Sequence, residues 1–498
     1  MHSPLRTILV LFVGIFSLAG AEDKKPDPKP EKVPDPVVRE DIAMIAGQEI
    51  PYKVTAAKLQ LKKSDGKARA SVFHISYERT DVDDPSTRPV LFAFNGGPGS
   101  SSVWLHLGGL GPRLVPTSPD GTRPLPPPHR VINNPHSILD VTDLVFIDPV
   151  STGYSRPESG AKGSEFHGVR EDIESVGDFI RRWMTEHRRW GSPKFLLGES
   201  YGGIRAAGLA HHLQSRFGMN LNGVVLLSSL LDFRTLRSGP GDDISNIIHL
   251  PAFTAIAHHH GKITGDRDKL VREARAYANG TYANLLFQGA DLDNKARHAA
   301  AKRLSALTGI SPAIWLETDL RLGSTRFRKE LLRQEGKVLG RFDARVAWPA
   351  TSKDSDYAAY DPSYSVAYGA FSTAMLDYLT GELGWREDHP YEILSRNVHP
   401  WNWGTENGFV NLSGRLSTAM RDNPSLRVLV QCGYTDLATP PGGIEHSVRH
   451  MFSLPAERRH AIEFAWYDAG HMFYLNEPDL AKMRLDLVRF VQSPAKAP

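Results

Sequence analysis

The residue of this sequence best suited to nucleophilic chemistry is a serine between glycines. Gly198-Glu199-Ser200-Tyr201-Gly202 has the spacing G-x-S-x-G, which forms a sharp turn that exposes the serine hydroxyl. A strand-like segment, 194–197, precedes the motif, and a segment with helical spacing, 204–217, follows it. A tight turn with a capping serine is the alternative interpretation. The strand–turn–helix context favours Ser200 as a nucleophile.

A serine hydroxyl needs an imidazole base, which a carboxylate must orient. Asp436 follows one strand-like run and His471 follows the next, in a loop before the last helix-like segment. Each residue alone could be an ordinary loop residue. The order Ser, Asp, His at successive strand ends predicts a triad of Ser200, Asp436 and His471.

A glycine-rich segment, 94–102, follows a third strand-like run and begins Phe94-Asn95-Gly96-Gly97-Pro98-Gly99. Successive glycines let backbone N–H groups point into a cavity, as an oxyanion hole requires. We expect the donors to be the N–H groups of Gly97 and Tyr201. A phosphate-binding loop is the competing interpretation, but the segment lacks a Gly-Lys-Ser/Thr ending and Pro98 removes a donor.

Other candidate sites are weaker. Three adjacent histidines, 258–260, point in different directions on a helix and cannot all bind one metal ion. The only cysteine, Cys432, lies in an apolar run and is expected to be a buried small residue rather than a catalytic thiol. A basic cluster, 181–189, is expected to be a solvated helix face, because the chain has a formal net charge of only +3 and no nucleic-acid-binding motif. We expect no metal, no cofactor and no nucleic-acid partner.

The elements that must position these residues alternate along the chain. Short apolar runs suit the buried strands of a parallel sheet, and they occupy 90–94, 144–147, 195–197, 224–227, 428–430 and 462–466. Helical spacing of apolar residues lies between some of them, as in 172–190 and 480–491. This pattern predicts an α/β fold with a mostly parallel sheet covered by helices on both faces, and the alternating residues of 51–78 suit antiparallel strands.

A mainly helical block, 235–396, interrupts this alternation and is interpreted as an inserted cap. The catalytic domain is then expected to comprise 37–234 and 397–498. Residues 22–36 are rich in Lys, Asp and Pro and are expected to form a linker.

The first 21 residues have the pattern of a secretory signal peptide. Arg6 precedes an almost wholly apolar stretch, 7–18, and Ala19-Gly20-Ala21 places small residues at a cleavage site. A retained signal anchor is the alternative. We expect cleavage near Ala21, no stable membrane insertion afterwards, and a secreted or periplasmic protein. A bacterial-type export compartment suits a chain that cannot form an internal disulfide.

Three motifs and two loops together resemble the serine carboxypeptidases, peptidase family S10. They are Asn95-Gly96-Gly97-Pro98-Gly99-Ser100-Ser101, the segment 147–155 beginning Ile147-Asp148-Pro149, Gly198-Glu199-Ser200-Tyr201-Gly202-Gly203, and the Asp436 and His471 loops. The resemblance implies an α/β-hydrolase fold. It also implies that Asn95, Gly96 and a protonated Glu199 bind the C-terminal carboxylate of a peptide substrate.

The sequence departs from this family at two places. The family usually has a second glutamate in the segment corresponding to 107–112, and none is present near Gly109. Ser100 stands where the family has a cysteine. Without a nearby carboxyl partner, Glu199 loses one reason for a raised pKa, so we expect weaker selectivity for a free C-terminus and a weaker preference for acidic pH.

The function that these residues predict is a serine-type carboxypeptidase acting on peptides through an acyl-enzyme. An esterase or acyltransferase on the same scaffold is the first alternative, because it would use the same acyl-enzyme. A catalytically inactive binding protein is the second. The sequence does not specify the side-chain preference or the oligomeric state.

Overall fold

The computed structural model of the chain describes residues 33–237, 239–356 and 358–493. The predicted signal peptide, 1–21, and residues 22–32 of the predicted linker lie outside the described residues. None of the described helices is long and apolar enough to cross a membrane.

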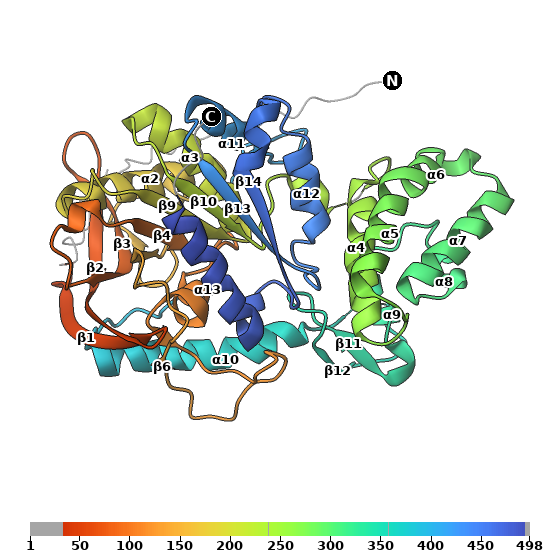
Figure 1. The fold of residues 1–498 in the computed structure, drawn as a ribbon, viewed down its shortest axis with the longest axis horizontal. Coiled ribbons are helices and arrows are strands. Elements are labelled where there is room, and N and C mark those ends of the chain that lie inside the picture. The colour runs from red at the N-terminus through yellow and green to blue at the C-terminus, as the bar shows by residue number, and fades with distance from the viewer. Residues whose placement is uncertain (1–32, 238, 357, 494–498) are drawn as a thin grey trace, which may run out of the picture.

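A ten-stranded sheet forms the centre of the molecule (Figure 1), in the order β1-β2-β3-β7-β4-β9-β10-β13-β14, with β8 paired to β3. The strands from β7 to β14 pair in parallel, and β1, β2 and β3 are antiparallel. The bounds are β1 Val37–Ile45, β2 Gln48–Lys62, β3 Ala68–Arg79, β4 Val90–Phe94, β7 Asp143–Ile147, β8 Arg156–Pro157, β9 Lys194–Glu199, β10 Gly223–Leu227, β13 Arg427–Gly433 and β14 Ile462–Tyr467. The predicted α/β fold is confirmed, and all six apolar runs form parallel strands.

Helices cover both faces of this sheet. Side chains alternate along a buried strand, so Leu196 of β9 packs in one core and Leu197 in the other. The core that contains Leu196 packs against α2 Val169–Glu186, α3 Tyr201–Phe217, α11 Ser413–Asp422 and α12 Pro441–Arg449. The core that contains Leu197 packs against α10 Pro362–Asp377 and α13 Glu477–Gln492, and α13 crosses this face in Figure 1.

A group of helices lies beside the sheet and has a hydrophobic core of its own, and Figure 1 shows it at the right. Its elements are α4 Ile244–His259, α5 Arg267–Tyr277, α6 Ala283–Phe287, α7 Asn294–Thr308, α8 Pro312–Glu317, α9 Ser324–Glu330, β11 Lys337–Leu339 and β12 Ala347–Pro349. The remaining short elements are α1 Val103–Leu105, β5 Arg113–Leu114 and β6 Ile132–Asn133.

Helix α10 belongs to the core of the sheet rather than to that of the cap, because Ala367, Phe371 and Ala374 pack with residues of β4 and β7. The division of the chain at 235 and 396 stays a prediction. The packing leads us to propose a narrower cap, 244–349, with α10 as part of the catalytic domain.

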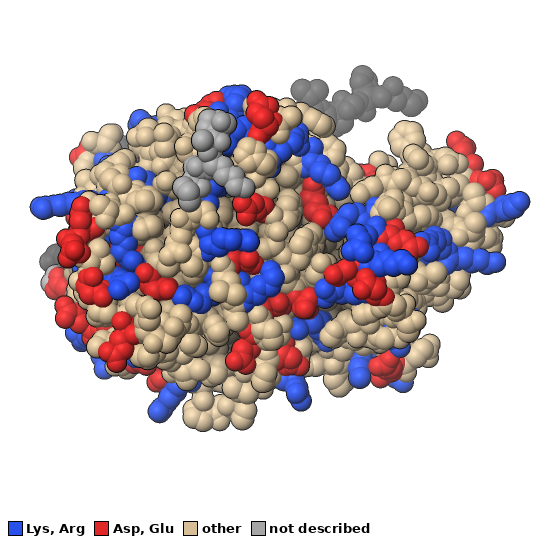
Figure 2. All heavy atoms as spheres, viewed as in Figure 1, with Lys and Arg blue, Asp and Glu red and all other residues tan. Residues whose placement is uncertain are grey.

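The basic cluster 181–189 is not uniformly solvated. Arg181 and Arg182 pair with Asp178 on the surface of α2, but Arg189 is buried and its guanidinium lies 2.6 Å from the Asp143 carboxylate. The prediction of a solvated helix face is therefore wrong for Arg189, which joins the end of α2 to the start of β7. Figure 2 shows acidic and basic side chains interspersed over the visible face.

Candidate active site

Ser200 lies at the turn between β9 and α3 and has a backbone φ of +61°. Such a conformation is strained for a residue with a side chain and is found mainly where the surrounding structure enforces it. Glycines permit the tight turn around it, because a Cβ on Gly198 would lie 2.1 Å from the Gly202 carbonyl oxygen. The predicted strand–turn–helix context of Ser200 is present.

Asp436 and His471 come from the ends of β13 and β14, and they are in direct contact. The His471 Nδ1 lies 2.8 Å from Asp436 Oδ2, and both residues are buried. The N–H groups of Ala438 and Thr439 donate to the other carboxylate oxygen of Asp436, at 2.7 and 2.9 Å. These bonds hold the carboxylate in one orientation toward the imidazole, as the predicted role of Asp436 requires.

The electrostatic environment of His471 has opposing contributions. Burial disfavours the imidazolium, but the Asp436 carboxylate and Glu199 favour it, and the pKa of His471 is raised on balance. Stabilisation of the imidazolium is what a base that takes a proton from serine needs.

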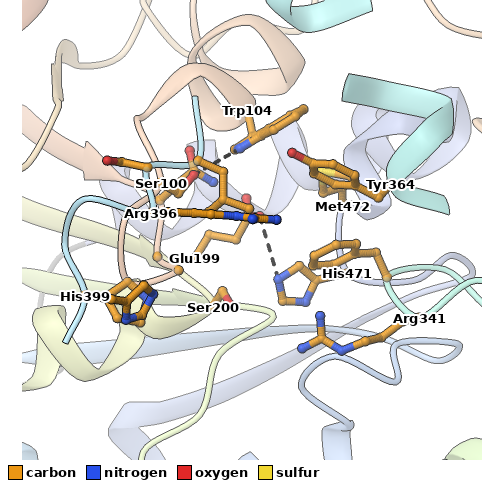
Figure 3. A pocket seen from close by; sticks show the side chains of 17 residues that line it. Ser100, Trp104, Glu199, Ser200, Arg341, Tyr364, Arg396, His399, His471 and Met472 are labelled. Atoms are coloured by element: carbon orange, nitrogen blue, oxygen red, sulfur yellow. Dashed lines mark hydrogen bonds and ion pairs between the residues drawn. The ribbon is translucent and has the colours of Figure 1, made fainter. Parts of the chain in front are cut away.

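Ser200, Glu199 and His471 line one pocket of about 370 Å³ (Figure 3). The other lining residues are Asn95, Gly96, Gly97, Pro98, Ser100, Trp104, Arg341, Phe342, Tyr364, Leu394, Ser395, Arg396, His399 and Met472. Asp436 lies behind His471 and is not among the lining residues. The structure therefore brings the three predicted triad residues to one place, with a cavity on the serine side.

The two backbone segments predicted to form an oxyanion hole converge beside Ser200. A Cβ on Gly96 would lie 2.4 Å from the Tyr201 nitrogen, so only glycine permits this approach. Tyr201 is the first residue of α3, and the first N–H groups of a helix have no partner within it. Gly97 lines the pocket and has φ of +100°.

The predicted carboxylate-binding residues also meet at this pocket. Glu199 is 3% exposed, and burial raises the pKa of its carboxyl to about 7 despite the nearby His471. The Asn95 side chain hydrogen-bonds Glu199, while its oxygen accepts the Leu105 N–H at 3.1 Å. This bond leaves the Asn95 amide NH₂ directed toward Glu199 and the pocket.

Tyr474 is a contact of Glu199 that the sequence did not indicate. Its hydroxyl donates to Glu199 Oε2 at 2.8 Å, and its ring is 1% exposed. A Cβ on Gly108 would lie 2.6 Å from this ring. The ring therefore fills the space that a side chain at Gly108 would need, in the segment 107–112 where the family's second glutamate is missing.

This arrangement bears on one expectation, which stays a prediction. The absence of a second glutamate led us to expect a weaker preference of the site for acidic pH. Burial is the largest cause of the raised pKa of Glu199, about 7, and the Asp436 carboxylate also raises it, so the raised pKa does not depend on a second glutamate. The Tyr474 hydroxyl donates a hydrogen bond to one oxygen of the Glu199 carboxyl.

Several pocket residues were missed because they come from distant segments. Arg341 and Phe342 follow β11, Tyr364 lies on α10, and Arg396 and His399 lie in the loop before α11. The His471 N–H donates to the Phe342 carbonyl at 2.6 Å, so the cap segment contacts the histidine loop directly. No local motif marks these residues, and only the fold brings them to Ser200.

The three adjacent histidines and Cys432 do not line the pocket that holds Ser200. His258 Nε2 and His260 Nε2 contact the carbonyls of Gly265 and Ala344. Among the described residues there is no group of three His, Cys, Asp or Glu side chains that could hold a metal ion. Cys432 is buried on β13, and burial raises the pKa of its thiol, which disfavours the reactive thiolate.

A serine at the turn after a central parallel strand, with a histidine and an aspartate at the following strand ends, is the arrangement of the α/β-hydrolase fold. The family model of the serine carboxypeptidases, Peptidase_S10, matches residues 59–463. The chain therefore belongs to the serine carboxypeptidase family.

Individual relatives share limited sequence identity with the chain. The chain is 27% identical over 203 residues to serine carboxypeptidase-like 36 of Arabidopsis thaliana, and this alignment covers 39% of each chain. It is 30% identical over 175 residues to the lysosomal protective protein of Mus musculus, covering 35% of this chain and 33% of that one. These alignments span well under half of the relatives' lengths.

A solved structure resembles the chain over most of its length. It is KEX1(delta)p, a prohormone-processing carboxypeptidase from Saccharomyces cerevisiae, with a TM-score of 0.54 and 16% identity. The match covers 88% of this chain and 91% of that chain. At this identity the likeness concerns the fold.

Proposed function

We propose that the protein is a serine carboxypeptidase that removes C-terminal residues from peptides. The observation that carries the proposal is the meeting of two groups of residues in one pocket. Ser200 and His471 can perform acyl transfer, and Asn95, Gly96 and Glu199 beside them can bind a carboxylate. A carboxylate held next to the nucleophile selects the last peptide bond of a chain.

The proposed reaction proceeds through an acyl-enzyme. The Ser200 Oγ attacks the scissile carbonyl carbon while His471 Nε2 accepts its proton. Asp436 stabilises the imidazolium, and the N–H groups of Gly97 and Tyr201 stabilise the oxyanion. His471 then donates the proton to the leaving amine, and water hydrolyses the ester at Ser200 by the reverse sequence of proton transfers.

Protonation of Glu199 is central to substrate binding. Two carboxylates in close contact repel each other, whereas a protonated carboxyl can donate a hydrogen bond to the substrate's carboxylate. Burial raises the pKa of Glu199 to about 7, so the carboxyl is protonated below that pH. Its Oε2 accepts from Tyr474, and we propose that this contact orients the carboxyl toward the pocket.

The nucleophile can be tested with a fluorophosphonate probe and a blocked dipeptide. We expect the probe to label Ser200, and Ser200→Ala to lower turnover roughly 10⁴-fold or more without loss of the folded state. Ser229→Ala changes a neighbouring buried serine whose hydroxyl donates to the Gly198 carbonyl. This matched control keeps Ser200, so the probe should still label it there. Labelling at another residue, or an active Ser200→Ala variant, would contradict the assignment.

The same acyl-enzyme would serve an esterase or an acyltransferase. A blocked dipeptide with a free C-terminus, its amide and the matching ester therefore need to be compared as substrates. A carboxypeptidase hydrolyses the free dipeptide in preference to the amide. Ester hydrolysis without peptide hydrolysis would favour an esterase, and no turnover of any substrate would favour an inactive binding protein.

We further propose that the protein is exported to the periplasm or the exterior of a bacterial-type cell, with cleavage between Ala21 and Glu22. The apolar stretch 7–18 and the small residues before Glu22 support this proposal. N-terminal sequencing of the exported protein is the test. A mature chain that begins at Met1 would indicate a retained anchor or a different role for the segment.

A further inference from the structure

Two arginines line the pocket that holds Ser200. Arg341 follows β11 of the cap, and Arg396 lies in the loop before α11. Both residues are exposed. Figure 3 shows their side chains on opposite sides of the His471 imidazole in that view, so the open side of the pocket carries a cation from each of two segments.

Neither guanidinium is paired with a carboxylate in the described part of the chain. Other arginines nearby are paired, since Arg345 lies 2.7 Å from Asp343 and Arg267 lies 2.5 Å from Asp468. The Arg341 guanidinium lies over the Phe342 ring, at 5.1 Å from its centroid. Two unpaired guanidinium groups at one pocket can bind an anion without first breaking an ion pair.

The acidic residues of the pocket do not offset this charge. Glu199 is the only Asp or Glu among the lining residues, and burial raises its pKa to about 7. At mildly acidic pH the carboxyl is therefore neutral and the two arginines remain charged. A pocket with one sign of charge attracts substrates of the opposite sign.

We propose that Arg341 and Arg396 select peptides that carry an acidic side chain next to the scissile bond. This inference rests on the proposed carboxypeptidase activity and specifies its substrate class. The substrate's terminal carboxylate binds Asn95, Gly96 and Glu199, and the two arginines bind a second carboxylate, from aspartate or glutamate. Apolar walls from Trp104, Tyr364 and Met472 accommodate the methylene groups of that side chain.

The test compares blocked dipeptides that differ only in whether one side chain ends in a carboxylate or in an amide. Glu is compared with Gln at the C-terminal position, and separately at the penultimate position, by kcat/KM at mildly acidic pH. We expect a preference for Glu of about tenfold at one of the two positions, because a charge-assisted hydrogen bond is stronger than a neutral one. The preference should fall at about 1 M salt, which screens exposed charges.

Variants identify the residues responsible. Arg396→Gln and Arg341→Gln should each lower the Glu/Gln ratio at the same position, and the double variant should bring it close to one. Arg415→Gln, at an exposed arginine of α11 outside the pocket, should leave the ratio unchanged.

The arginines could instead bind the terminal carboxylate, which has the same chemistry. In that case the two variants would lower the ratio of free dipeptide to its amide and leave the Glu/Gln ratio unchanged, and the inference would be wrong. Wild-type protein that hydrolyses Glu and Gln dipeptides equally would also overturn it. Wild-type protein that hydrolyses neither would instead contradict the proposed carboxypeptidase activity itself.

Discussion

At the scale of single residues, the proposed function gives the buried Glu199 a part in both acyl transfer and substrate selection. It precedes the nucleophile, lies 3.9 Å from His471 Nε2, and accepts a hydrogen bond from Tyr474 at 2.8 Å. Because Glu199 and His471 lie this close, the protonation state of each residue affects the pKa of the other. The proposed mechanism of peptide hydrolysis requires a protonated Glu199 and a neutral His471.

Tyr474→Phe tests the role of the hydroxyl in this arrangement. A donor to Glu199 stabilises its ionised form, so removing the donor should raise the pKa of Glu199 further. We expect the alkaline limb of kcat/KM for a free dipeptide to move up by about one unit, since such a hydrogen bond is worth ~1.5 kcal/mol. The retained ring keeps the space beside Gly108 filled.

The control is Tyr467→Phe, which removes another largely buried hydroxyl, one that donates to Asp486 at 2.9 Å. This variant should leave the position of the limb unchanged. A Tyr474→Phe variant with lower activity at every pH and an unmoved limb would show that the hydroxyl has only a structural role.

At the scale of elements, a buried ion pair joins the two helices behind the nucleophile to the glycine-rich loop. Arg205 of α3 lies 2.8 Å from Asp172 of α2, and its guanidinium also donates to the Asn95 carbonyl at 2.6 Å. Both charged residues are almost fully buried. The position of Asn95 therefore depends on the packing of α2 against α3.

Arg205→Leu should destabilise the protein strongly, because it leaves the Asp172 carboxylate buried without its partner. Breaking a buried pair in this way costs about 3–5 kcal/mol, which denaturant unfolding would measure as a lower free energy of unfolding. Arg170→Leu, at an exposed arginine of α2 paired with Glu171, should change it by about 0.5 kcal/mol or less. Equal effects of the two substitutions would refute the proposed role of the buried pair.

At the scale of the whole molecule, the pH dependence reports on the assembled pocket. Glu199 is protonated below about pH 7 and ionised above it. In the proposed mechanism the carboxyl donates to the substrate's carboxylate only when protonated, so we expect this contribution to binding at lower pH and its loss as the pH rises through 7. An amide substrate carries no carboxylate and does not depend on this proton.

The ratio of kcat/KM for a free dipeptide to that for its amide should therefore fall as the pH rises from about 5 to 9, around the raised pKa of Glu199. We expect a fall of roughly tenfold to a hundredfold, the worth of one hydrogen bond to a charged group. Titration of His471 changes kcat/KM for both substrates, so its effect largely cancels in the ratio.

Glu199→Gln is the companion variant for this measurement. Its amide can donate a hydrogen bond at any pH, so the ratio should become nearly independent of pH, and the variant should lose less activity at high pH than at low pH. A wild-type ratio that stays constant across pH 7 would exclude Glu199 as the proton donor to the substrate's carboxylate.

The sequence by itself determined the parallel sheet and the order of the catalytic candidates. Both depend on local signals, because short apolar runs indicate buried strands and the glycines around Ser200 permit only a sharp turn. Since the carboxyl ends of parallel strands share one edge of the sheet, the loops with Ser200, Asp436 and His471 could be placed together before any contact was known.

Only the tertiary structure decided what surrounds these residues. Arg341, Arg396 and Tyr474 come from segments with no recognisable motif, and their approach to Glu199 and His471 depends on packing between elements far apart in the chain. Burial, which raises the pKa of Glu199 to about 7, is likewise a property of the assembled pocket. The missing glutamate was visible in the sequence, but the contact between Tyr474 and Glu199 was not, because a side chain's neighbours across the core follow from three-dimensional packing rather than from spacing along the chain.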